Sequence, residues 1–328
     1  MKKYNIAIVG AAGAVGREIV KILEERNFPL NELRLFATER SCGIKVPFQG
    51  REIEVTKICE NSFDNIDFAF FSAGTKASQI IAPKAVKSGA IVIDNSNAFR
   101  METDVPLIVP EVNPKAAFKH KGIIANPNCS TIQMVAALKP VYDKVGIRRI
   151  IISTYQSISG TGKKAIDELM KQTKAVLNSE QINTNIYPHQ IAFNVLPHID
   201  VFEENGFTRE EMKMVNETKK ILNDDEISVN ATCVRVPVII GHAESVYVET
   251  KQDCSIEEFK EILSNFPGVK VFSDDDNYPM PIDSSSDDDV LVGRIRKYRE
   301  REFNLWIVAN NVRKGAALNA VQIAELLI

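Results

Sequence analysis

Cys129 stands in the segment NPNCSTIQMVAAL, where a turn rich in asparagine and proline leads into an apolar run. This order predicts that the cysteine lies at the N-terminus of a helix. The backbone N–H groups and the partial positive charge of a helix N-terminus stabilise a thiolate. Cys129 is therefore a candidate nucleophile.

The other cysteines are Cys42, Cys59, Cys233 and Cys254. An odd, scattered set without C-x-x-C spacing argues against a disulfide framework and against a zinc site. We expect Cys233 and Cys59 to be small buried hydrophobes. We also expect no bound metal, and a reducing, cytoplasmic setting.

A glycine motif, GAAGAVG at 10–16, follows the apolar run YNIAIV and opens a helical pattern. Its spacing is G-x-x-G-x-x-G. Small residues let backbone N–H groups approach a pyrophosphate, and the helix N-terminus offers partial positive charge. The alternative is a tight strand–helix turn without a ligand, but the position between strand and helix favours a dinucleotide site.

The residues after the second apolar run, LRLFA, bear on the choice of dinucleotide. They are Thr38, Glu39, Arg40 and Ser41. An acidic residue here would hold the ribose 2′-hydroxyl of NAD, whereas an arginine between hydroxyl residues suits the 2′-phosphate of NADP. Glu39 argues for NAD and Arg40 for NADP, and we favour NADP.

A reactive thiol beside a dinucleotide suggests one reaction in particular. The thiolate adds to a carbonyl, the adduct exchanges hydride with a nicotinamide, and the carbonyl carbon passes through a thioester. Such a scheme needs a base. His242, in VIIGHAES, follows a strand-like run and a glycine, where its side chain can face a cleft, whereas His120, His189 and His198 suit surface or core positions.

The first 125 residues alternate strand-like and helix-like patterns. Strand–helix–strand alternation implies parallel strands with helical crossovers, hence a doubly wound sheet. The later runs RRIIISTYQSISG and NATCVRVPVIIGHAESVYVET are longer and have fewer helices between them, which predicts a mixed, largely antiparallel sheet. TREEMKMVNETKKIL is predicted as an amphipathic helix, and we expect the terminal GAALNAVQIAELLI helix to pack on the first domain.

We therefore predict a dinucleotide-binding domain formed by residues 1–127 and 313–328, and a catalytic domain formed by residues 128–312. The composition is 45% hydrophobic and 25% charged, with a net charge of −3, which is typical of a soluble globular protein and gives no basic surface for nucleic acid. The apolar runs are too short to cross a membrane or to act as a signal peptide. The acidic stretch SDDDNYPMPIDSSSDDD is predicted as an exposed loop, because it cannot bury enough apolar surface to order itself. The alternative is a metal site at its Asp cluster, but the Asp spacing fits no calcium loop.

With these motifs in place, the chain resembles the bacterial aspartate-β-semialdehyde dehydrogenase family. The resemblance runs from end to end through GAAGAVG, FSAG, DNSNAFR, VPLIVPEVN, NPNCSTIQ, STYQSISGTG, EMKMVNETKKI, TCVRVPV, GHAESVYVET and VGRIRK. It implies a Rossmann-like NADP-binding domain, an α+β catalytic and dimerisation domain, and a homodimer or homotetramer. The implied reaction reduces L-4-aspartyl phosphate with NADPH to aspartate semialdehyde and inorganic phosphate, at the branch toward lysine, threonine, methionine and diaminopimelate.

The resemblance also implies residue roles. Cys129 would form the acyl-thioester, His242 would be the acid/base, and Gln156 would orient the substrate. The implied substrate contacts are Arg100 and Lys220 for phosphate, Glu217 for the ammonium, Arg235 for the carboxylate, and Asn128 beside the nucleophile. The implied cofactor contacts are Gly10, Ala12, Gly13, Ala14 and Val15 for the pyrophosphate, Arg40 and Ser41 for the 2′-phosphate, and Ser159, Gly160 and Asn311 near the nicotinamide. The segment GTGKKA would continue the nicotinamide loop.

One departure from the family pattern and two rival interpretations remain. Lys76 and Ala77 stand in FSAGTKAS where the family has small hydroxyl residues, which bears on cofactor affinity. An N-acetyl-γ-glutamyl-phosphate reductase shares the acyl-phosphate chemistry, but its acetylated amine offers no ammonium for Glu217. A nucleotide sensor without activity would have no need of Cys129 or His242.

Overall fold

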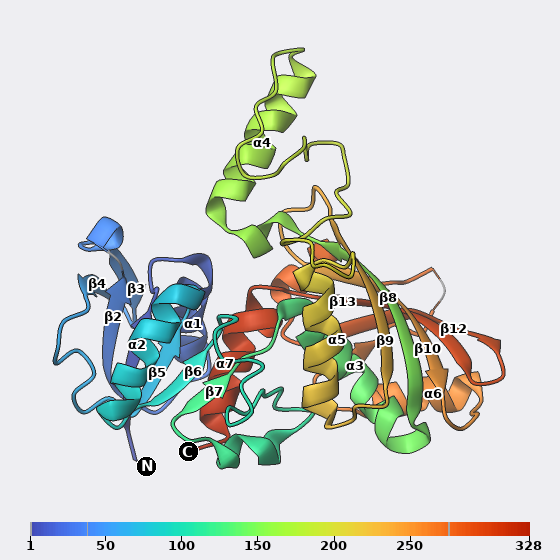
Figure 1. Ribbon diagram of the computed structural model, residues 1–328, viewed down its shortest axis with the longest axis horizontal. Helices are drawn as coiled ribbons and strands as arrows, with labels where there is room; N and C mark the ends of the chain where they lie inside the picture. Colours follow the sequence, from blue (N-terminus) through green and yellow to red (C-terminus); the bar gives the residue numbers. More distant parts are fainter. Residues whose placement is uncertain (1, 38, 275) are drawn as a thin grey trace. The chain divides into compact units, whose positions relative to one another are not determined.

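The computed structural model describes residues 2–37, 39–274 and 276–328, the side chains of Arg40 and Ser286 excepted. The chain forms two compact units, Met1–Asn128 with Ala316–Ile328, and Cys129–Gly315 (Figure 1). From the sequence we expect these divisions at 127/128 and 312/313. Thr38, at the end of the second predicted strand, lies outside the described residues.

The first unit contains a seven-stranded sheet in the order β3-β4-β2-β1-β5-β6-β7. All neighbouring strands are parallel except the β3–β4 hairpin. The strand order reverses at β1, whose neighbours are β2 and β5, and ligands of such sheets bind at the carboxyl end of the strands beside that reversal. The strands are β1 (Tyr4–Val9), β2 (Leu30–Ala37), β3 (Lys45–Phe48), β4 (Arg51–Lys57), β5 (Phe68–Phe71), β6 (Ile91–Asp94) and β7 (Ile123–Ala125).

Helices cover both faces of this sheet, which explains why residues 6–9 of β1 form a continuous buried apolar run instead of alternating. Ile6 and Ile8 pack in one core cluster with α1 (Ala14–Glu25) and α7 (Leu318–Glu325). Ala7 and Val9 pack in another with α2 (Thr75–Lys87). The terminal helix is thus part of the core of the first unit, and Arg26 of the α1 C-cap forms an ion pair with Glu325 at 2.7 Å. This unit also holds the short 3₁₀ helices η1 (Glu39–Ser41) and η2 (Pro114–Lys119).

The second unit contains a six-stranded mixed sheet in the order β11-β12-β13-β10-β8-β9. The three central pairings are antiparallel and the two outer ones are parallel. The largely antiparallel sheet predicted from the sequence is confirmed. The strands are β8 (Ile147–Gln156), β9 (Ser228–Arg235), β10 (His242–Thr250), β11 (Val269–Val271), β12 (Val290–Arg299) and β13 (Glu302–Ala309).

Helix α3 (Cys129–Val145) packs against β8, β10, β12 and β13, and α5 (Arg209–Leu222) packs against β9 and α3. Because side chains alternate along a strand, Thr154 and Gln156 of β8 are buried, whereas Ile151 and Tyr155 of the other face are 44% and 38% exposed. On β10 the same alternation places His242 and Glu244 together on one face. Helix α6 (Ile256–Ser264) also contacts α3.

Helix α5 begins where the sequence predicts it, and its start has a clear local cause. The Thr208 side chain accepts a hydrogen bond from the backbone of Glu211, and the Glu211 carboxylate accepts one from the backbone of Thr208. This capping box satisfies two of the N–H groups that a helix start leaves without partners.

Several features of the structure differ from the predictions or add to them. The β3–β4 hairpin and α4 (Lys163–Leu177) were not predicted. The predicted acidic loop holds two 3₁₀ turns at η4 (Pro281–Ser286), and part of the GTGKKA segment lies in α4 and not in a loop. Cys59 is exposed, so its predicted burial is wrong, whereas Cys233 is buried as expected.

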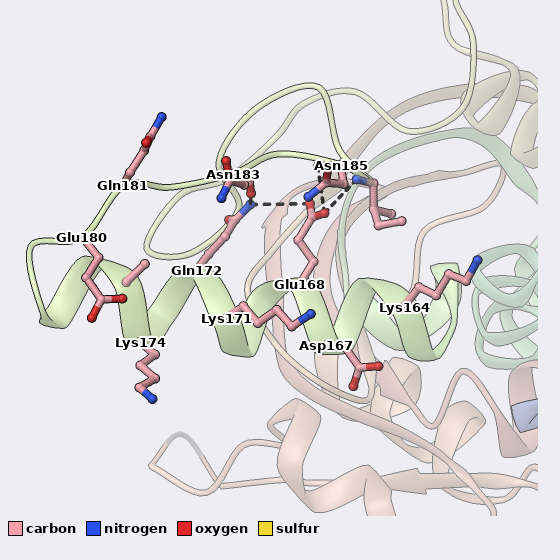
Figure 2. A pocket seen from close by; sticks show the side chains of 12 residues that line it. Lys164, Asp167, Glu168, Lys171, Gln172, Lys174, Glu180, Gln181, Asn183 and Asn185 are labelled. Atoms are coloured by element: carbon pink, nitrogen blue, oxygen red, sulfur yellow. Dashed lines mark hydrogen bonds between the residues drawn. The ribbon is translucent and has the colours of Figure 1, made fainter.

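Helix α4 projects from the second unit in Figure 1, and residues 183–192 are bound to it by two buried polar side chains. The Glu168 carboxylate accepts hydrogen bonds from the backbone of Asn185 and Ile186 at 2.9 and 2.8 Å. Gln172 accepts from the backbone of Ile191 at 2.9 Å. Figure 2 shows these side chains beside a cavity of about 560 Å³. The buried carboxylate is occupied in holding the loop.

Within the described residues, no helix is long and apolar enough to cross a membrane. In the same residues, no group of three or more His, Cys, Asp or Glu side chains is placed to hold a metal ion.

Candidate active site

Cys129 is the first residue of α3, which confirms the predicted helix start. Its side chain is partly exposed. The segment after β13 packs closely against it, because a Cβ atom added to Gly315 would lie 2.9 Å from the Cys129 Cβ. Only glycine fits at that distance. Gly315 belongs to the π-helical segment Arg313–Ala317. This conformation is rare in proteins overall, and where it occurs it often lies at a functional site.

His242 is the first residue of β10 and is fully buried. The backbone N–H of Ser157 donates to its Nδ1 at 3.0 Å, and the Ser157 hydroxyl lies 3.0 Å from the same nitrogen. Because a backbone N–H can only donate, Nδ1 is an acceptor, and the neutral ring carries its proton on Nε2. No described side chain or backbone group hydrogen-bonds Nε2, and a Cβ atom on Gly160 would lie 3.4 Å from it.

The charge state of His242 follows from its surroundings. Burial, with the Arg235 guanidinium as a second cause, lowers the pKa of His242 to about 3, and Glu210 opposes this shift. The ring is therefore neutral at physiological pH, and Nε2–H is available as a hydrogen-bond donor to a reacting oxygen.

Asn311 holds the backbone around this histidine. Its Oδ1 accepts hydrogen bonds from the Ser157 and Ser159 hydroxyls at 3.1 Å each and from the backbone N–H of Gly241 at 3.0 Å. These contacts tie the segment after β8 to the residue before His242. The structure therefore gives Asn311 a contact that positions the segment after β8 beside His242, in addition to the cofactor contact that the resemblance implies.

Gln156, the last residue of β8, is buried beside this cluster. Its amide donates to the Glu210 carboxylate at 3.0 Å, and Glu210 also pairs with Lys213 at 3.0 Å. Glu210 is a functional candidate that the sequence analysis missed. Its signal was its position on the predicted helix seven residues before Glu217, which places both on one helix face.

Arg235, the last residue of β9, pairs in register with Gln156 and is buried. Its Nη1 donates to the Ser157 carbonyl at 2.6 Å. A Cβ atom on Gly160 would lie 3.2 Å from the same nitrogen. The structure thus brings Gln156, Gly160, Arg235, His242 and Asn311 together around Ser157.

On α5, Glu217 is buried and Lys220 is partly exposed. They lie three residues apart, which places them on one side of the helix as predicted.

In the first unit, the glycine motif connects β1 to α1. Gly10 has φ +92°, and a Cβ there would lie 2.5 Å from the Ser72 carbonyl oxygen, while a Cβ on Gly16 would lie 2.3 Å from the Gly10 carbonyl oxygen. Gly13 is the N-cap of α1 without a side-chain cap, and the first turn holds no acidic residue. Ala12 and Val15 are partly exposed, and Gly13 and Ala14 are exposed. The loop therefore offers backbone N–H groups to an anion.

The residues after β2 form η1. Glu39 forms an ion pair with Lys57, and this hydrogen bond lowers the pKa of the Glu39 carboxyl. Ser41 is partly exposed, and the side chain of Arg40 lies outside what the structure describes. Lys76, at the start of α2, is exposed.

Arg100 is buried near the carboxyl ends of β6 and β7. Its Nε donates to the Asn126 carbonyl and its Nη2 to the Asn95 carbonyl, each at 2.9 Å. Asn128, the last residue of the first unit before α3, is also buried.

Comparison with known proteins identifies the family. The family model of the semialdehyde dehydrogenase NAD binding domain matches residues 5–120, and that of the semialdehyde dehydrogenase dimerisation domain matches residues 138–314. An aspartate-semialdehyde dehydrogenase of Aquifex aeolicus (strain VF5) is 58% identical, over 99% of this chain and 98% of the relative.

Solved structures agree with the family models. A crystal structure of aspartate semialdehyde dehydrogenase II from Vibrio cholerae, complexed with ASA, has a TM-score of 0.98 at 51% identity, covering 100% of this chain and 98% of that chain. A crystal structure of aspartate semialdehyde dehydrogenase with NADP from Candida albicans has a TM-score of 0.77 at 26% identity, covering 99% and 98%. The resemblance indicated by the motifs is confirmed, and the chain belongs to the aspartate-semialdehyde dehydrogenase family.

Proposed function

We infer that the chain is an NADP-dependent, phosphorylating aspartate-semialdehyde dehydrogenase, which reduces L-4-aspartyl phosphate to L-aspartate 4-semialdehyde and releases inorganic phosphate. The reaction belongs to the biosynthesis of lysine, diaminopimelate, threonine and methionine. Family membership supports this assignment. The observation that carries it is the buried, neutral His242, whose Nε2–H faces Gly160 in the same unit in which Cys129 begins a helix.

The first half of the reaction forms the thioester. The Cys129 thiolate attacks the acyl carbon of aspartyl phosphate, a carbon–sulfur bond forms, and the bond from carbon to the phosphate oxygen breaks. The phosphate leaves with the electron pair of that bond, and the acyl group remains on sulfur. His242 supports this step from Nε2, since its N–H donates to the carbonyl oxygen as negative charge develops there.

The second half releases the aldehyde. When bound, the nicotinamide cofactor would supply a hydride to the thioester carbon. His242 then donates a hydrogen bond from Nε2–H to the resulting oxyanion and stabilises its negative charge. The carbonyl re-forms as the carbon–sulfur bond breaks, and the sulfur leaves with the electron pair as the Cys129 thiolate. The neutral ring thus acts as a hydrogen-bond donor within the acid/base role expected from the sequence.

Substrate binding is proposed from the charges around this centre. Arg235, buried beside His242, would hold the substrate carboxylate, and the buried Glu217 would hold its ammonium. Gln156 would orient the carbonyl, while Glu210 fixes the direction of the Gln156 amide. Arg100 and Lys220 would bind the phosphate, and Asn128 the reacting end of the substrate. Guanidinium groups suit carboxylate and phosphate because both can be bound with two parallel hydrogen bonds.

The residues present fit a dinucleotide. Gly10 and Gly16 bring the backbone closer than any side chain allows, so Gly10, Ala12, Gly13, Ala14 and Val15 would line the pyrophosphate. Ser159, Gly160 and Asn311 would lie against the nicotinamide, at the loop that also positions His242.

The choice of NADP over NAD is supported by the engagement of Glu39 with Lys57, which leaves Glu39 less suited to hold a ribose hydroxyl. Arg40 and Ser41 would then bind the 2′-phosphate. The structure of the relative from Candida albicans was determined with NADP.

The chain holds the dimerisation domain of its family. We propose a homodimer formed through the face of the second sheet that exposes Ile151 and Tyr155, with a homotetramer as the larger alternative. A cytoplasmic location remains our expectation from the sequence.

The assay that tests this function measures NADPH formation from NADP and aspartate semialdehyde, with inorganic phosphate present or withheld. Phosphate-dependent reduction is the expected result. Reduction of NADP with N-acetylglutamate semialdehyde but not with aspartate semialdehyde would move the assignment to the N-acetyl-γ-glutamyl-phosphate reductases. Inactivity with both aldehydes would revive the sensor hypothesis.

A further inference from the structure

Two buried polar side chains follow the proposed catalytic pair, Cys129 and His242, on the same helix and strand of the second unit. Glu244 of β10 and Gln133 of α3 are both fully buried. Among the described residues, none forms a hydrogen bond of acceptable geometry with the carboxyl oxygens of Glu244 or with the amide atoms of Gln133. Polar groups in such a position cost stability, and the mechanism above uses neither of them.

The two side chains face each other. The Gln133 amide lies near enough to Glu244 to counteract in part the effect of burial, which raises the pKa of that carboxyl well above its ordinary value. Burial therefore favours the neutral form of this carboxyl, which can donate as well as accept a hydrogen bond. In that form its donor and acceptors complement those of the Gln133 amide.

The spacing relates this pair to the catalytic residues. Gln133 lies four residues after Cys129 on α3, about 6 Å along the helix axis. Glu244 lies two residues after His242 on the same face of β10, roughly 6.6 Å along the strand. Helix α3 packs against β10, so the two pairs form successive layers between the same two elements.

The ends of both elements meet one further segment. His242 pairs in register with Ala309, and Cys129 lies against Gly315. A contact between Gln133 and Glu244 would therefore set how far α3 is displaced along β10, and hence how far the sulfur lies from Nε2 of His242.

We propose that Gln133 and Glu244 form a buried link that sets the position of Cys129 relative to His242. Glu244 is thus a positioning residue of the reaction. The inference rests on the function proposed above, because it concerns the nucleophile and acid of that reaction.

Other titratable groups also face this layer. They are His242 on the same strand, Cys233 on β9, and Glu210 and Glu211 on α5. Burial, followed by the charges of these glutamates, raises the pKa of the Cys233 thiol. Cys233 is therefore a neutral neighbour of this layer.

The test compares two variants with the wild type. Glu244→Gln keeps a neutral group of the same shape that can donate and accept. The double variant Gln133→Leu with Glu244→Leu removes both partners, a change that is often neutral or favourable for stability. The readouts are the melting temperature, kcat, KM and the pH profile of kcat.

We expect Glu244→Gln to retain kcat and its pH profile. We expect the double variant to melt at or above the wild-type temperature, with KM little changed and kcat lowered about 10- to 100-fold, as misplacement of reacting groups by about 1 Å can produce. A purely structural role would change the melting temperature and leave kcat intact.

Two results would overturn the proposal. One is full kcat in the double variant. The other is a Glu244→Gln variant whose kcat falls or whose pH profile shifts, because either change would mean that the reaction needs an ionised carboxylate at position 244. If the double variant does not fold, the kcat and the pH profile of Glu244→Gln suffice as the test. Inactivity of the wild type with aspartate semialdehyde counts instead against the proposed function.

Discussion

The glycine loop of the first unit and the His242 cluster of the second unit are built in opposite ways. The loop connects β1 directly to the start of α1, and its geometry depends on two glycines six residues apart, with the Ser72 carbonyl packed against the first of them. The cluster gathers residues from the ends of β8 and β9, the start of β10 and the segment after β13. Its central contact, Ser157 to Asn311, joins residues 154 positions apart. A local motif can be recognised from sequence, whereas such a cluster depends on strand register.

The largest effect is expected from the nucleophile itself. Cys129→Ala removes the group that forms the thioester, so turnover should fall by at least about 10⁴-fold. NADP binding depends on the glycine loop and should be retained, as measured by titration of the cofactor. Normal turnover in this variant would eliminate the proposed mechanism.

The His242 cluster should make the stability of the protein depend on pH. The pKa of His242 is about 3 in the folded protein and 6.5 without perturbation, so the unfolded state binds more protons between these values. The contribution is complete above pH 6.5 and is lost as the pH falls toward 3, with a slope of at most about 1.4 kcal/mol per pH unit.

Chemical unfolding at several pH values measures this slope in the wild type and in His242→Gln. The variant should lack the part contributed by the histidine. Equal slopes in the two proteins would show that the ring is not held neutral by its surroundings.

A lesion in the glycine loop should remain local. Gly10→Ala forces a side chain into a left-handed conformation and against the Ser72 carbonyl. We expect a loss of about 1–3 kcal/mol in the free energy of unfolding and weak NADP binding, while alkylation of Cys129 by iodoacetamide is unchanged. Gly13→Ala is the matched control, since its Cβ would lie 3.3 Å from the nearest atom and its φ is not positive. A Gly13 variant that loses as much as the Gly10 variant would contradict this account.

A substitution at Asn311 should instead affect both the stability of the protein and the groups around His242. Asn311→Ala leaves the buried Gly241 N–H without its acceptor and removes one acceptor of the Ser157 hydroxyl, which costs about 1–3 kcal/mol of unfolding free energy. We expect kcat to fall as well, because both groups adjoin His242. Asn311→Asp retains an acceptor and should lose less of the unfolding free energy and less of kcat. Unfolding and initial-rate measurements on the two variants test this, and equal losses would point to charge or size as the cause.

The smallest effect is expected at the edge of the cofactor loop. Lys57→Ala releases Glu39 from its exposed ion pair. Exposed pairs contribute little to stability, so the melting temperature should not change. The ratio of kcat/KM with NAD to that with NADP should rise by a small factor. An unchanged ratio would mean that Glu39 does not oppose NAD binding.

Much of the fold was predictable because its signals are local. The alternation of strands and helices before Cys129 predicted the doubly wound sheet, and the β10 segment was visible as a run of branched residues. The β3–β4 hairpin was missed because its strands carry a proline and many charged residues, as suits an exposed sheet edge. Helix α4 was missed in a stretch interpreted as a cofactor loop.

The candidate site divides along the same line. Cys129 at a helix start and the glycine loop follow from neighbouring residues, since a turn, an apolar run and small side chains suffice to predict them. Their roles toward substrate and cofactor stay predictions that came from the family resemblance. Glu210, Ser157 and Glu244 carried no sequence signal strong enough to single them out.

The sequence by itself determined which residues could react and where the helix and the loop that present them begin. Only the tertiary structure decided that the Ser157 backbone fixes the proton of His242 on Nε2, and that Gln133 of α3 faces Glu244 of β10. The physical reason is that hydrogen bonding and burial at these atoms depend on strand pairing and helix packing between residues about 80 to 150 positions apart, which no local pattern encodes.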